Sequence, residues 1–373
     1  MGESLNNPVI IVGAGLSGLR AASLLTAQGI ECKVLEVRDR IGGRILSTLS
    51  PNRPELGKFD LGPTWFWPQY ERTITNLVQE LQLETFDQYT KGAMLFERFQ
   101  NQPPERYIPP EHSVQRSMRF TGGIQSLIEA IAGTLPPGIV ELKTRVTAIQ
   151  LDDSGSITIE ADLTGGQKRE FLASAVILAL PPRLVARHID FFPALSPELI
   201  ADLVNKPTWM AGQAKAIAIY EHPFWRESGL SGFVSSWAGP LQEIHDASPD
   251  TGAGALFGFF GMSAKVRREL GEDKILEQVI DQLVRLFGPS AKKVSAVLYK
   301  DWSRDTETAV AEDSAPLQNF PSYGQPPKAG VWGNKIIFAG TETSSEFGGH
   351  LEGALQSAEQ AALKITTLRR FYS

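Results

Sequence analysis

The stretch VIIVGAGLSG, from Val9 to Gly18, decides the fold. Its four apolar β-formers lead into a glycine turn of the form GxGxxG, and Leu19–Gln28 then carries apolar residues at helical spacing. A second short strand, Cys32–Leu35, ends at Glu36. This order predicts a strand, helix and strand with a dinucleotide bound at the turn, and both strands are expected to be buried in a parallel sheet.

The three glycines of the turn have different tasks. Gly13 permits the tight turn, Gly15 lets the backbone approach a pyrophosphate, and Gly18 allows the helix to pack closely on the strand. Glu36 follows the turn by about 20 residues, where a carboxylate can accept both hydroxyls of an adenosine ribose and would repel a 2′-phosphate. The pattern therefore favours FAD or NAD over NADP. The alternative for Glu36 is a solvent-exposed strand end.

The segment after Glu36 favours FAD over NAD. It reads VRDRIGGR and places the glycine pair Gly42-Gly43 and the guanidinium of Arg44 beside the first turn. A flexible backbone and an arginine can hold a pyrophosphate from its second side. The alternative for Arg44 is an ordinary surface charge.

The organisation of the chain follows from its length and from its last elements. A chain of 373 residues exceeds the size of a single core, which rarely passes about 250–300 residues. Lys335–Ala339 and Leu351–Leu368 are a strand and a helix typical of the first lobe, although they lie 300 residues away. We therefore predict an α/β fold: a discontinuous Rossmann-like FAD-binding domain (1–70, 115–190 and 303–373) and a second, α+β substrate-binding lobe (71–114 and 191–302).

The remaining elements are expected from periodicity and breakers. We expect helical pieces between Tyr70 and Met118, strands at Val140–Leu151, Ser156–Ala161, Ala175–Leu180 and Gln213–Tyr220, and a helix at Lys274–Phe287.

Composition excludes several classes of protein. The net charge of −6, without a basic patch, argues against a nucleic-acid partner. The single cysteine, Cys32, excludes an internal disulfide and suits a reducing compartment. The first seven residues predict no secretory signal, and no apolar run approaches the roughly 18 residues of a membrane span. We expect a cytoplasmic protein with no metal and no membrane partner, and the oligomeric state stays open.

Further motifs complete a family pattern. They are Asp60-Leu61-Gly62 with aromatic residues after it, Ala179-Leu180-Pro181-Pro182, Lys215 with Phe224-Trp225, Trp302, Phe338-Ala339-Gly340-Thr341-Glu342-Thr343, and Gly349-His350-Leu351-Glu352-Gly353. With the glycine turn, Glu36 and Arg44, this set resembles the flavin-containing amine oxidase family, which includes monoamine and polyamine oxidases. The resemblance implies non-covalent FAD, a small amine substrate, transfer of a hydride equivalent to flavin N5, an imine product, and oxygen as the acceptor that yields hydrogen peroxide.

Lys215 is the first candidate catalytic residue. It carries the single charge of its predicted strand and shares a face with Ile217 and Ile219 by period-two alternation. A lysine on an apolar face is costly unless it meets a partner or a wet cavity. The resemblance implies that it holds a water against flavin N5. The alternative is a lysine that extends to solvent from an edge strand.

The resemblance also implies the other site residues. His350 and Trp302 join Lys215 as candidate catalytic residues. The candidate cofactor-binding residues are Gly13, Gly15, Ser17, Gly18, Glu36, Arg38, Gly43, Arg44, Gly62, Thr64, Val146, Gly340, Thr341, Glu342, Gly349 and Leu351. The candidate substrate-binding residues are Trp65, Phe259, Glu312 and His350.

The chain departs from monoamine oxidases at two places. The two positions of their aromatic cage match Glu312 and His350, neither of which is aromatic, so an acidic residue such as Glu312 or Glu346 is a candidate partner for an ammonium group. The cysteine that attaches flavin covalently is replaced by Ala311. Two other functions stay open: a flavin oxidoreductase that acts on C–C bonds, of the desaturase or protoporphyrinogen-oxidase type, and an FAD-binding module without turnover.

Overall fold

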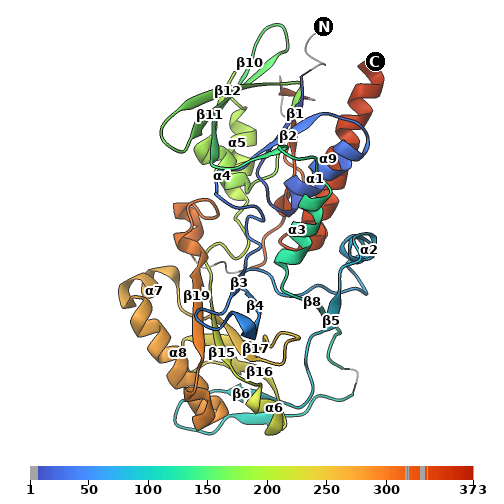
Figure 1. Cartoon of the computed structure of the whole chain (residues 1–373). Helices are drawn as coiled ribbons and strands as arrows, with labels where there is room; N and C mark the ends of the chain where they lie inside the picture. The colour runs from blue at the N-terminus through green and yellow to red at the C-terminus, as the bar shows by residue number, and fades with distance from the viewer. Residues whose placement is uncertain are drawn as a thin grey trace.

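The computed structural model describes residues 7–111, 113–315, 317, 319–327, 332–333 and 335–372. Residues 1–6, which belong to the stretch without a predicted secretory signal, lie outside this range. The molecule is elongated and has two lobes, and both ends of the described chain lie in the same lobe (Figure 1). Within the described residues, no helix combines the length and the apolar character needed to cross a membrane.

The first lobe is built on a five-stranded parallel sheet. Its order is β20 (Ile336–Phe338), β13 (Ala175–Leu178), β1 (Val9–Val12), β2 (Cys32–Leu35) and β9 (Val140–Glu141). All four neighbouring pairs run parallel. The late strand β20 therefore completes a sheet that begins at Val9, which confirms the predicted α/β fold.

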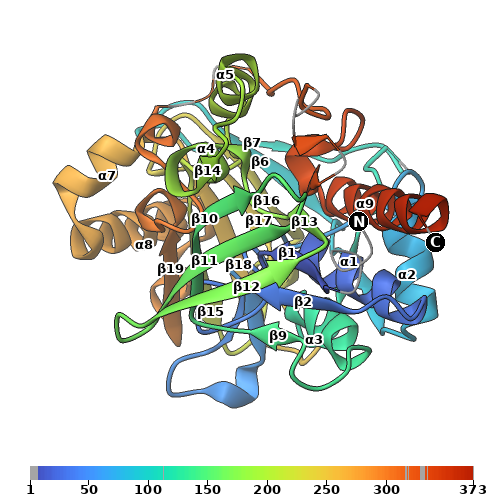
Figure 2. The ribbon, with the colours of Figure 1, turned by 90° about the horizontal axis from the view of Figure 1, so that it is seen from above.

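Alternate residues of β1 build two separate cores. Val9 and Ile11 pack toward α1 (Leu16–Ala27), α3 (Gln125–Gly133) and α9 (Leu351–Tyr372). Ile10 and Val12 pack toward a second sheet and two short helices. That layer consists of β12 (Lys168–Ala173), β11 (Ile157–Leu163), β10 (Thr144–Leu151) and β14 (Asp190–Phe192), with α4 (Pro182–His188) and α5 (Pro197–Asn205). The view from above shows β10, β11 and β12 on one side of β1 and β2, and α1, α3 and α9 on the other (Figure 2).

The second lobe is built on a seven-stranded sheet. Its order is β19 (Ala296–Asp301), β15 (Ala214–Tyr220), β18 (Gly254–Phe260), β17 (Leu241–Asp246), β16 (Leu230–Ser236), β6 (Ala93–Glu97) and β7 (Glu105–Tyr107). The helices α6 (Phe224–Glu227), α7 (Ala264–Leu270) and α8 (Glu272–Phe287) belong to the same lobe. In Figure 1 α7 and α8 lie along the outer side of this sheet.

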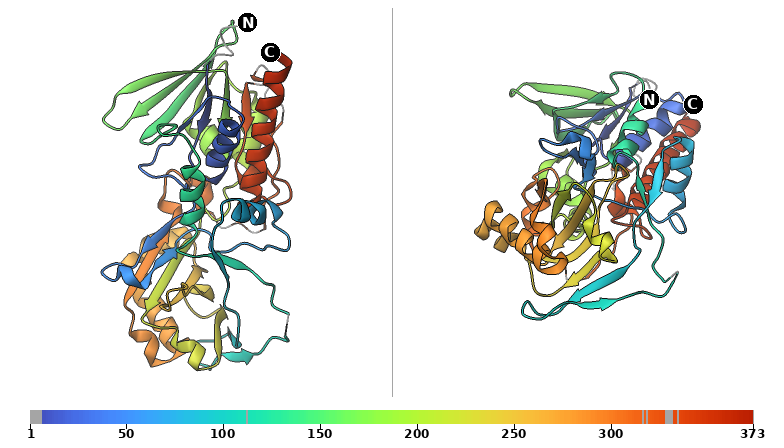
Figure 3. Two further views of the ribbon diagram at one scale, coloured as in Figure 1. Left: turned by 45° about the vertical axis from the view of Figure 1, so that its right-hand side comes forward. Right: turned by 60° about the horizontal axis from the view of Figure 1, so that its bottom comes forward.

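Strand β15 is buried along its whole length and separates two cores. Its alanines, Ala214, Ala216 and Ala218, pack with the apolar face of α8. Ile217 and Ile219 pack on the opposite face with Phe59 of β4 (Lys58–Asp60). With β3 (Ser47–Leu49), β4 forms a two-stranded sheet that lies near the junction of the lobes (Figure 3). A segment of the first cofactor stretch thus packs directly on the second lobe.

The region between Tyr70 and Met118 differs from its helical prediction. Its described residues form one helix, α2 (Arg72–Glu80), followed by β5 (Thr85–Asp87), β6, β7 and β8 (Met118–Phe120). In β6, Ala93, Leu95 and Glu97 are buried while their neighbours are half-buried, which is the period of a strand. The predicted strand Val140–Leu151 is divided into β9 and β10 because Lys143 has a φ of 58°.

Two helices predicted to belong to the substrate-binding lobe pack on the first lobe instead. Helix α2, assigned to the substrate lobe, packs Ile74 and Leu77 into the core of the first lobe. Helix α5, also assigned to the substrate lobe, packs Leu199 and Leu203 beneath the four-stranded sheet of the first lobe. Both helices use an apolar stripe that fits either lobe, so the sequence alone does not select the surface that they cover.

Helix α2 begins against a carboxylate from α9. The side chain of Glu352 is buried, and its two oxygens accept hydrogen bonds of 2.9 Å from the N–H groups of Thr73 and Ile74. The residue at the N-cap of α2, Glu71, supplies no side-chain cap of its own. Glu352 therefore satisfies the free N–H groups with which every helix begins.

We expect Glu352→Ala to lower the free energy of unfolding by about 1.5–3 kcal/mol, because two charge-assisted hydrogen bonds are lost and the N–H groups of half-buried Thr73 and buried Ile74 stay unpaired. Chemical denaturation measures this change. Gln360→Ala, at an exposed position of the same helix, is the matched control and should stay within about 0.5 kcal/mol of the parent. Equal stability of the two variants would contradict the capping role.

Candidate active site

The glycine turn after β1 leaves a gap in front of its backbone. Gly13 has a φ of +102°, and a Cβ there would lie 2.8 Å from the carbonyl oxygen of Ala179. A Cβ on Gly18 would lie 1.9 Å from the carbonyl oxygen of Gly13, so the helix packs here at a distance that only glycine permits. A Cβ on Gly15 would meet nothing within 4 Å. Gly15 therefore faces open space, as a pyrophosphate site requires.

Glu36 fastens the turn and lines the same cavity. Its carboxylate is buried and accepts hydrogen bonds from the N–H groups of Ala14 (2.7 Å) and Arg38 (2.9 Å), one on each oxygen. Each carboxylate oxygen can accept more than one hydrogen bond, so both keep capacity for ribose hydroxyls. Glu36 is among the residues that line the cavity. It is not a solvent-exposed strand end.

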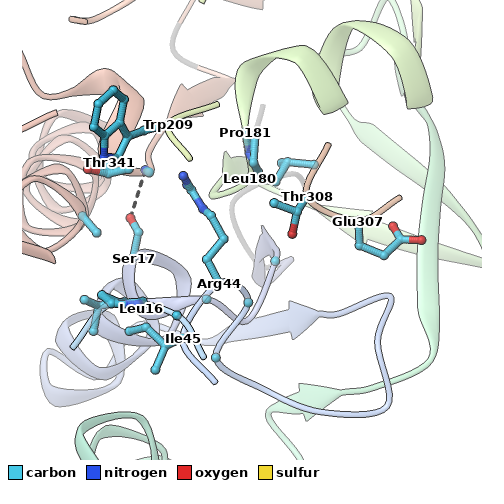
Figure 4. A pocket seen from close by; sticks show the side chains of 18 of the residues that line it. Leu16, Ser17, Arg44, Ile45, Leu180, Pro181, Trp209, Glu307, Thr308 and Thr341 are labelled. Atoms are coloured by element: carbon cyan, nitrogen blue, oxygen red, sulfur yellow. Dashed lines mark hydrogen bonds between the residues drawn. The ribbon is translucent and has the colours of Figure 1, made fainter. Parts of the chain in front are cut away.

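Arg44 lines the cavity and is held by Glu342. The Nη1 and Nη2 atoms of Arg44 lie 2.7 and 3.1 Å from the two carboxylate oxygens of the buried Glu342. In Figure 4 Arg44 rises from its loop into the space between Thr341 and Leu180. Arg44 lines the cavity and Glu342 does not, so Glu342 positions the guanidinium from behind. This differs from the predicted direct placement of Glu342 beside the cofactor.

One backbone N–H joins three distant segments. The amide of Gly340 donates to the hydroxyls of Ser17 in α1 and Ser357 in α9, both at 3.0 Å. The bond to Ser17 is the dashed line in Figure 4. Thr341 then donates from Oγ1 to the carbonyl oxygen of His350 at 2.8 Å. These bonds place the end of β20 and the start of α9 beside the glycine turn.

Lys215 is enclosed at the other end of the cavity. The residue is 2% exposed, and its Nζ donates to Thr64 Oγ1 (2.6 Å) and to the carbonyl oxygen of Gly62 (3.0 Å). The same atom lies 3.9 Å from the ring centroid of Phe257. Burial lowers the pKa of Lys215 from 10.5 to about 7; Asp60 raises it and Arg119 lowers it further. Because β15 lies between β19 and β18, Lys215 is not on an edge strand.

The structure brings most of the predicted site residues to one cavity of about 350 Å³. Of the predicted residues, the cavity is lined by Gly13, Gly15, Ser17, Glu36, Arg38, Gly43, Arg44, Gly62, Thr64, Trp65, Val146, Lys215, Phe259, Trp302, Gly340, Thr341, Gly349, His350 and Leu351. They come from both lobes. A dinucleotide that starts at β2 and Val146 and ends near Lys215 would extend from the first lobe to the second.

Several of these residues also stabilise the walls of the cavity. Trp302 donates from Nε1 to the carbonyl oxygen of Leu61 at 3.0 Å. Arg38 donates to Asp305 Oδ1 at 2.5 Å and to Thr308 Oγ1 at 2.9 Å. The two residues therefore hold the segment after β19 against the cofactor stretch, and both still face the cavity.

Glu312 lies outside the cavity, contrary to its predicted contact with substrate. It belongs to a 3-10 turn (Ala311–Ser314) and pairs with Arg187 on the surface. Its neighbour Asp313 points inward instead and pairs with Arg183 at 2.5 Å. The 3-10 turn thus buries the carboxylate of Asp313 and directs that of Glu312 away from the cavity.

Sequence reasoning missed other residues that line the cavity, among them Glu71, His188, Trp209 and Gln213. Glu71 was hidden because an acidic residue just before an amphipathic helix resembles an N-cap. Its carboxylate instead lies 3.1 Å from Nδ1 of His350. Trp209 packs on Gly349, where a Cβ would come within 3.0 Å of the indole ring.

Comparison with known proteins identifies the family. The family described as flavin containing amine oxidoreductase matches residues 110–366, and an NAD(P)-binding Rossmann-like domain matches residues 11–81. The chain belongs to the flavin-containing amine oxidoreductases. It is therefore an FAD-dependent amine oxidase, which acts on CH–NH₂ groups.

Individual relatives match over nearly the whole chain. The "Probable flavin-containing monoamine oxidase A" of Dictyostelium discoideum is 25% identical, over 96% of this chain and 97% of that protein. The flavin-containing amine oxidase B of Sus scrofa is 24% identical, over 96% of this chain and 85% of that protein. A putrescine oxidase solved with putrescine bound has the same fold, with a TM-score of 0.78, 22% identity, and coverage of 97% and 99% of the two chains.

The residues of the cavity fit FAD held without a covalent bond. Open space at Gly15, acceptor oxygens on Glu36 and the guanidinium of Arg44 supply the pieces that a dinucleotide needs. The single cysteine, Cys32, is buried, and burial, aided by Glu31, raises its pKa to about 11. It does not line the cavity, and Ala311 has no thiol, so no cysteinyl bond to flavin can form. The described residues hold no cluster that could bind a metal ion.

The two glycines of the turn predict opposite phenotypes. Gly15→Ala should fold with a nearly unchanged Tm but bind FAD at least about tenfold more weakly, because its methyl group enters the space for the pyrophosphate. Gly18→Ala, the matched control, should lower the Tm because its methyl group overlaps the carbonyl oxygen of Gly13. Calorimetry and FAD titration measure the two effects. Unchanged FAD affinity in Gly15→Ala would place the dinucleotide elsewhere.

Burial of Lys215 predicts a pH-dependent stability. From about pH 7 to 10.5 the folded state carries neutral Lys215 while the unfolded chain carries a charged one, so the unfolded state binds more protons and stability rises with pH. Lys215→Met removes this gain. We expect the difference in Tm, variant minus parent, to fall as the pH rises through this range. A difference that is constant with pH would show that Lys215 is not desolvated.

Proposed function

We propose that the protein oxidises small amines by hydride transfer to a flavin and releases hydrogen peroxide. The observation that carries this proposal is the buried Lys215, which lines the same cavity as the dinucleotide-binding residues Gly15, Glu36 and Arg44. When bound, FAD would supply the redox chemistry: it would accept a hydride equivalent at N5 from the carbon next to nitrogen and pass the electrons to oxygen as peroxide, and the imine product would be hydrolysed.

Residues of the first lobe would hold the cofactor. The N–H groups after Gly13 and the guanidinium of Arg44 suit a pyrophosphate, and Glu36 suits an adenosine ribose. Gly349 and Leu351 bring the amino terminus of α9 to the cavity. A helix begins with free N–H groups and a positive dipole end, which favours a bound group that becomes anionic on reduction.

Residues of the second lobe and the junction would bind the amine. Trp65, Trp67 and Phe259 line the cavity beside Lys215, and the rings of Trp65 and Trp67 lie 6.3 Å apart at 75°. Aromatic faces accept alkyl chains and attract cationic nitrogen. The putrescine bound to a protein of the same fold supports a small aliphatic amine as substrate.

Anaerobic mixing of the holoenzyme with benzylamine, cyclohexylamine and putrescine tests the proposal. We expect at least one of these amines to bleach the flavin, and readmitted oxygen to restore it with release of peroxide. Flavin that no amine reduces would overturn the proposal and leave two alternatives. A desaturase would reduce its flavin with a C–C substrate, whereas a binding module would keep its flavin oxidised with every substrate.

Lys215→Met should retain FAD but slow flavin reduction or reoxidation by about 100-fold, because the cavity loses its single buried ammonium or amine group. Stopped-flow absorbance measures the two half-reactions separately. Lys265→Met, at an exposed position on α7, is the control and should match the parent. Unchanged rates of both half-reactions in Lys215→Met would refute the role of Lys215.

A further inference from the structure

Two residues far apart in the chain meet in the wall of the cavity. Glu71 precedes α2 and His350 precedes α9, and Nδ1 of the imidazole lies 3.1 Å from Oε1 of the carboxylate. The second oxygen of Glu71 accepts from the N–H of Trp67 at 2.8 Å. The side chain of Glu71 is 3% exposed and that of His350 is 38% exposed. Both residues line the cavity that contains Lys215.

The contacts assign the tautomer of His350. Because a carboxylate without a proton only accepts hydrogen bonds, Nδ1 must carry the hydrogen that Glu71 receives. In the neutral ring Nε2 is then an acceptor with a free lone pair. Within the described part of the chain, no protein group takes a hydrogen bond from Nε2 or gives one to it. The ring of Trp67, with its centroid 5.8 Å away, limits its tilt.

Amine oxidation requires a lone pair on nitrogen, since that pair forms the C=N bond as the hydride leaves the neighbouring carbon. An aliphatic amine arrives near neutral pH as an ammonium ion, which has no free pair. A group in the cavity that accepts this proton would let the enzyme oxidise amine that binds as ammonium. Lys215 is fixed by its two hydrogen bonds to Thr64 and Gly62, whereas Nε2 of His350 makes no hydrogen bond within the described part of the chain.

We propose that His350 is the base that deprotonates the bound ammonium and that Glu71 is its positioning residue. This inference rests on the proposed amine oxidation. The N–H bond of the ammonium breaks, its electron pair stays on the amine nitrogen, and the proton forms a bond to Nε2. The carboxylate of Glu71 stabilises the resulting imidazolium, as the buried acid of a hydrolase triad does. The proton then leaves to water, because His350 is partly exposed.

The surroundings of His350 support this division of roles. Among the described residues, the titratable side chain hydrogen-bonded to His350 is Glu71, from the chain before α2, and Lys215 of β15 lines the same cavity. Glu352, two residues along α9, is engaged with the start of α2. Glu312, the acidic residue predicted for this wall, is paired with Arg187 outside the cavity. Glu71 is therefore the carboxylate that accompanies His350.

Anaerobic stopped-flow reduction by benzylamine, from about pH 6 to about pH 10, tests the proposal with the FAD-loaded enzyme. His350→Phe and Glu71→Gln should keep their flavin, verified by its absorbance. At neutral pH we expect kred/Kd to fall by about 100-fold in His350→Phe and by about 10-fold in Glu71→Gln. Both losses should disappear at high pH, where the amine binds as the free base.

Two further variants separate a base from a structural residue. Glu352→Gln, a buried carboxylate of the same helix that does not line the cavity, should lower the Tm but keep the parent pH profile. His350→Ala should regain activity at neutral pH with added imidazole. A loss in His350→Phe that is equal at every pH, or no loss at all, would overturn the proposal. If the parent flavin is reduced by no amine, amine oxidation itself fails and this inference fails with it.

Discussion

The cavity depends on one shared hydrogen-bond donor. The N–H of Gly340 reaches both Ser17 and Ser357, so the first helix, the last strand and the last helix meet at a single backbone atom. Serine hydroxyls are short enough to bring these backbones together, and they satisfy an amide that would otherwise be buried unpaired. Ser17 belongs to the glycine turn, and the residues that follow Gly340 contact the rest of the site: Thr341 bonds to His350, and Glu342 pairs with Arg44. The two hydrogen bonds of Gly340 thus fix these parts of the site relative to one another.

A second constraint is the placement of charge in an apolar sheet. Lys215 is buried on the face of β15 that also carries Ile217 and Ile219. Its burial is tolerated because Thr64 and the carbonyl of Gly62 accept its hydrogens and because the ring of Phe257 lies over it. The acceptors come from the first cofactor stretch and the lysine from the second lobe. The contact that reduces the cost of burial also holds the lobes together.

The parts that could be predicted from sequence are those with local causes. The glycine turn, β13 and Lys215 follow from patterns within ten residues, where propensity and alternation decide the outcome, and Glu36 follows from its spacing of about 20 residues after the turn. Sequence reasoning missed Glu71 and placed Glu312 wrongly, because the role of neither side chain is set by local sequence. Their directions depend on a distant partner, His350 for the first and Arg187 for the second, which no local pattern reveals. The same limit applies to α2 and α5, whose apolar stripes fit either lobe.

The order of the strands in the parallel sheet also bears on how the protein is made. Strand β20 and helix α9 are synthesised after the other described strands and α-helices, yet β20 pairs with β13, and α9 packs on α1 near the start of the described chain. Until they emerge, β13 is an edge strand of the sheet, and Gly340 and Gly349 are not yet beside the glycine turn. Loading of flavin must therefore wait until α9 has left the ribosome, and a nascent chain that pauses earlier exposes β13 as an edge strand.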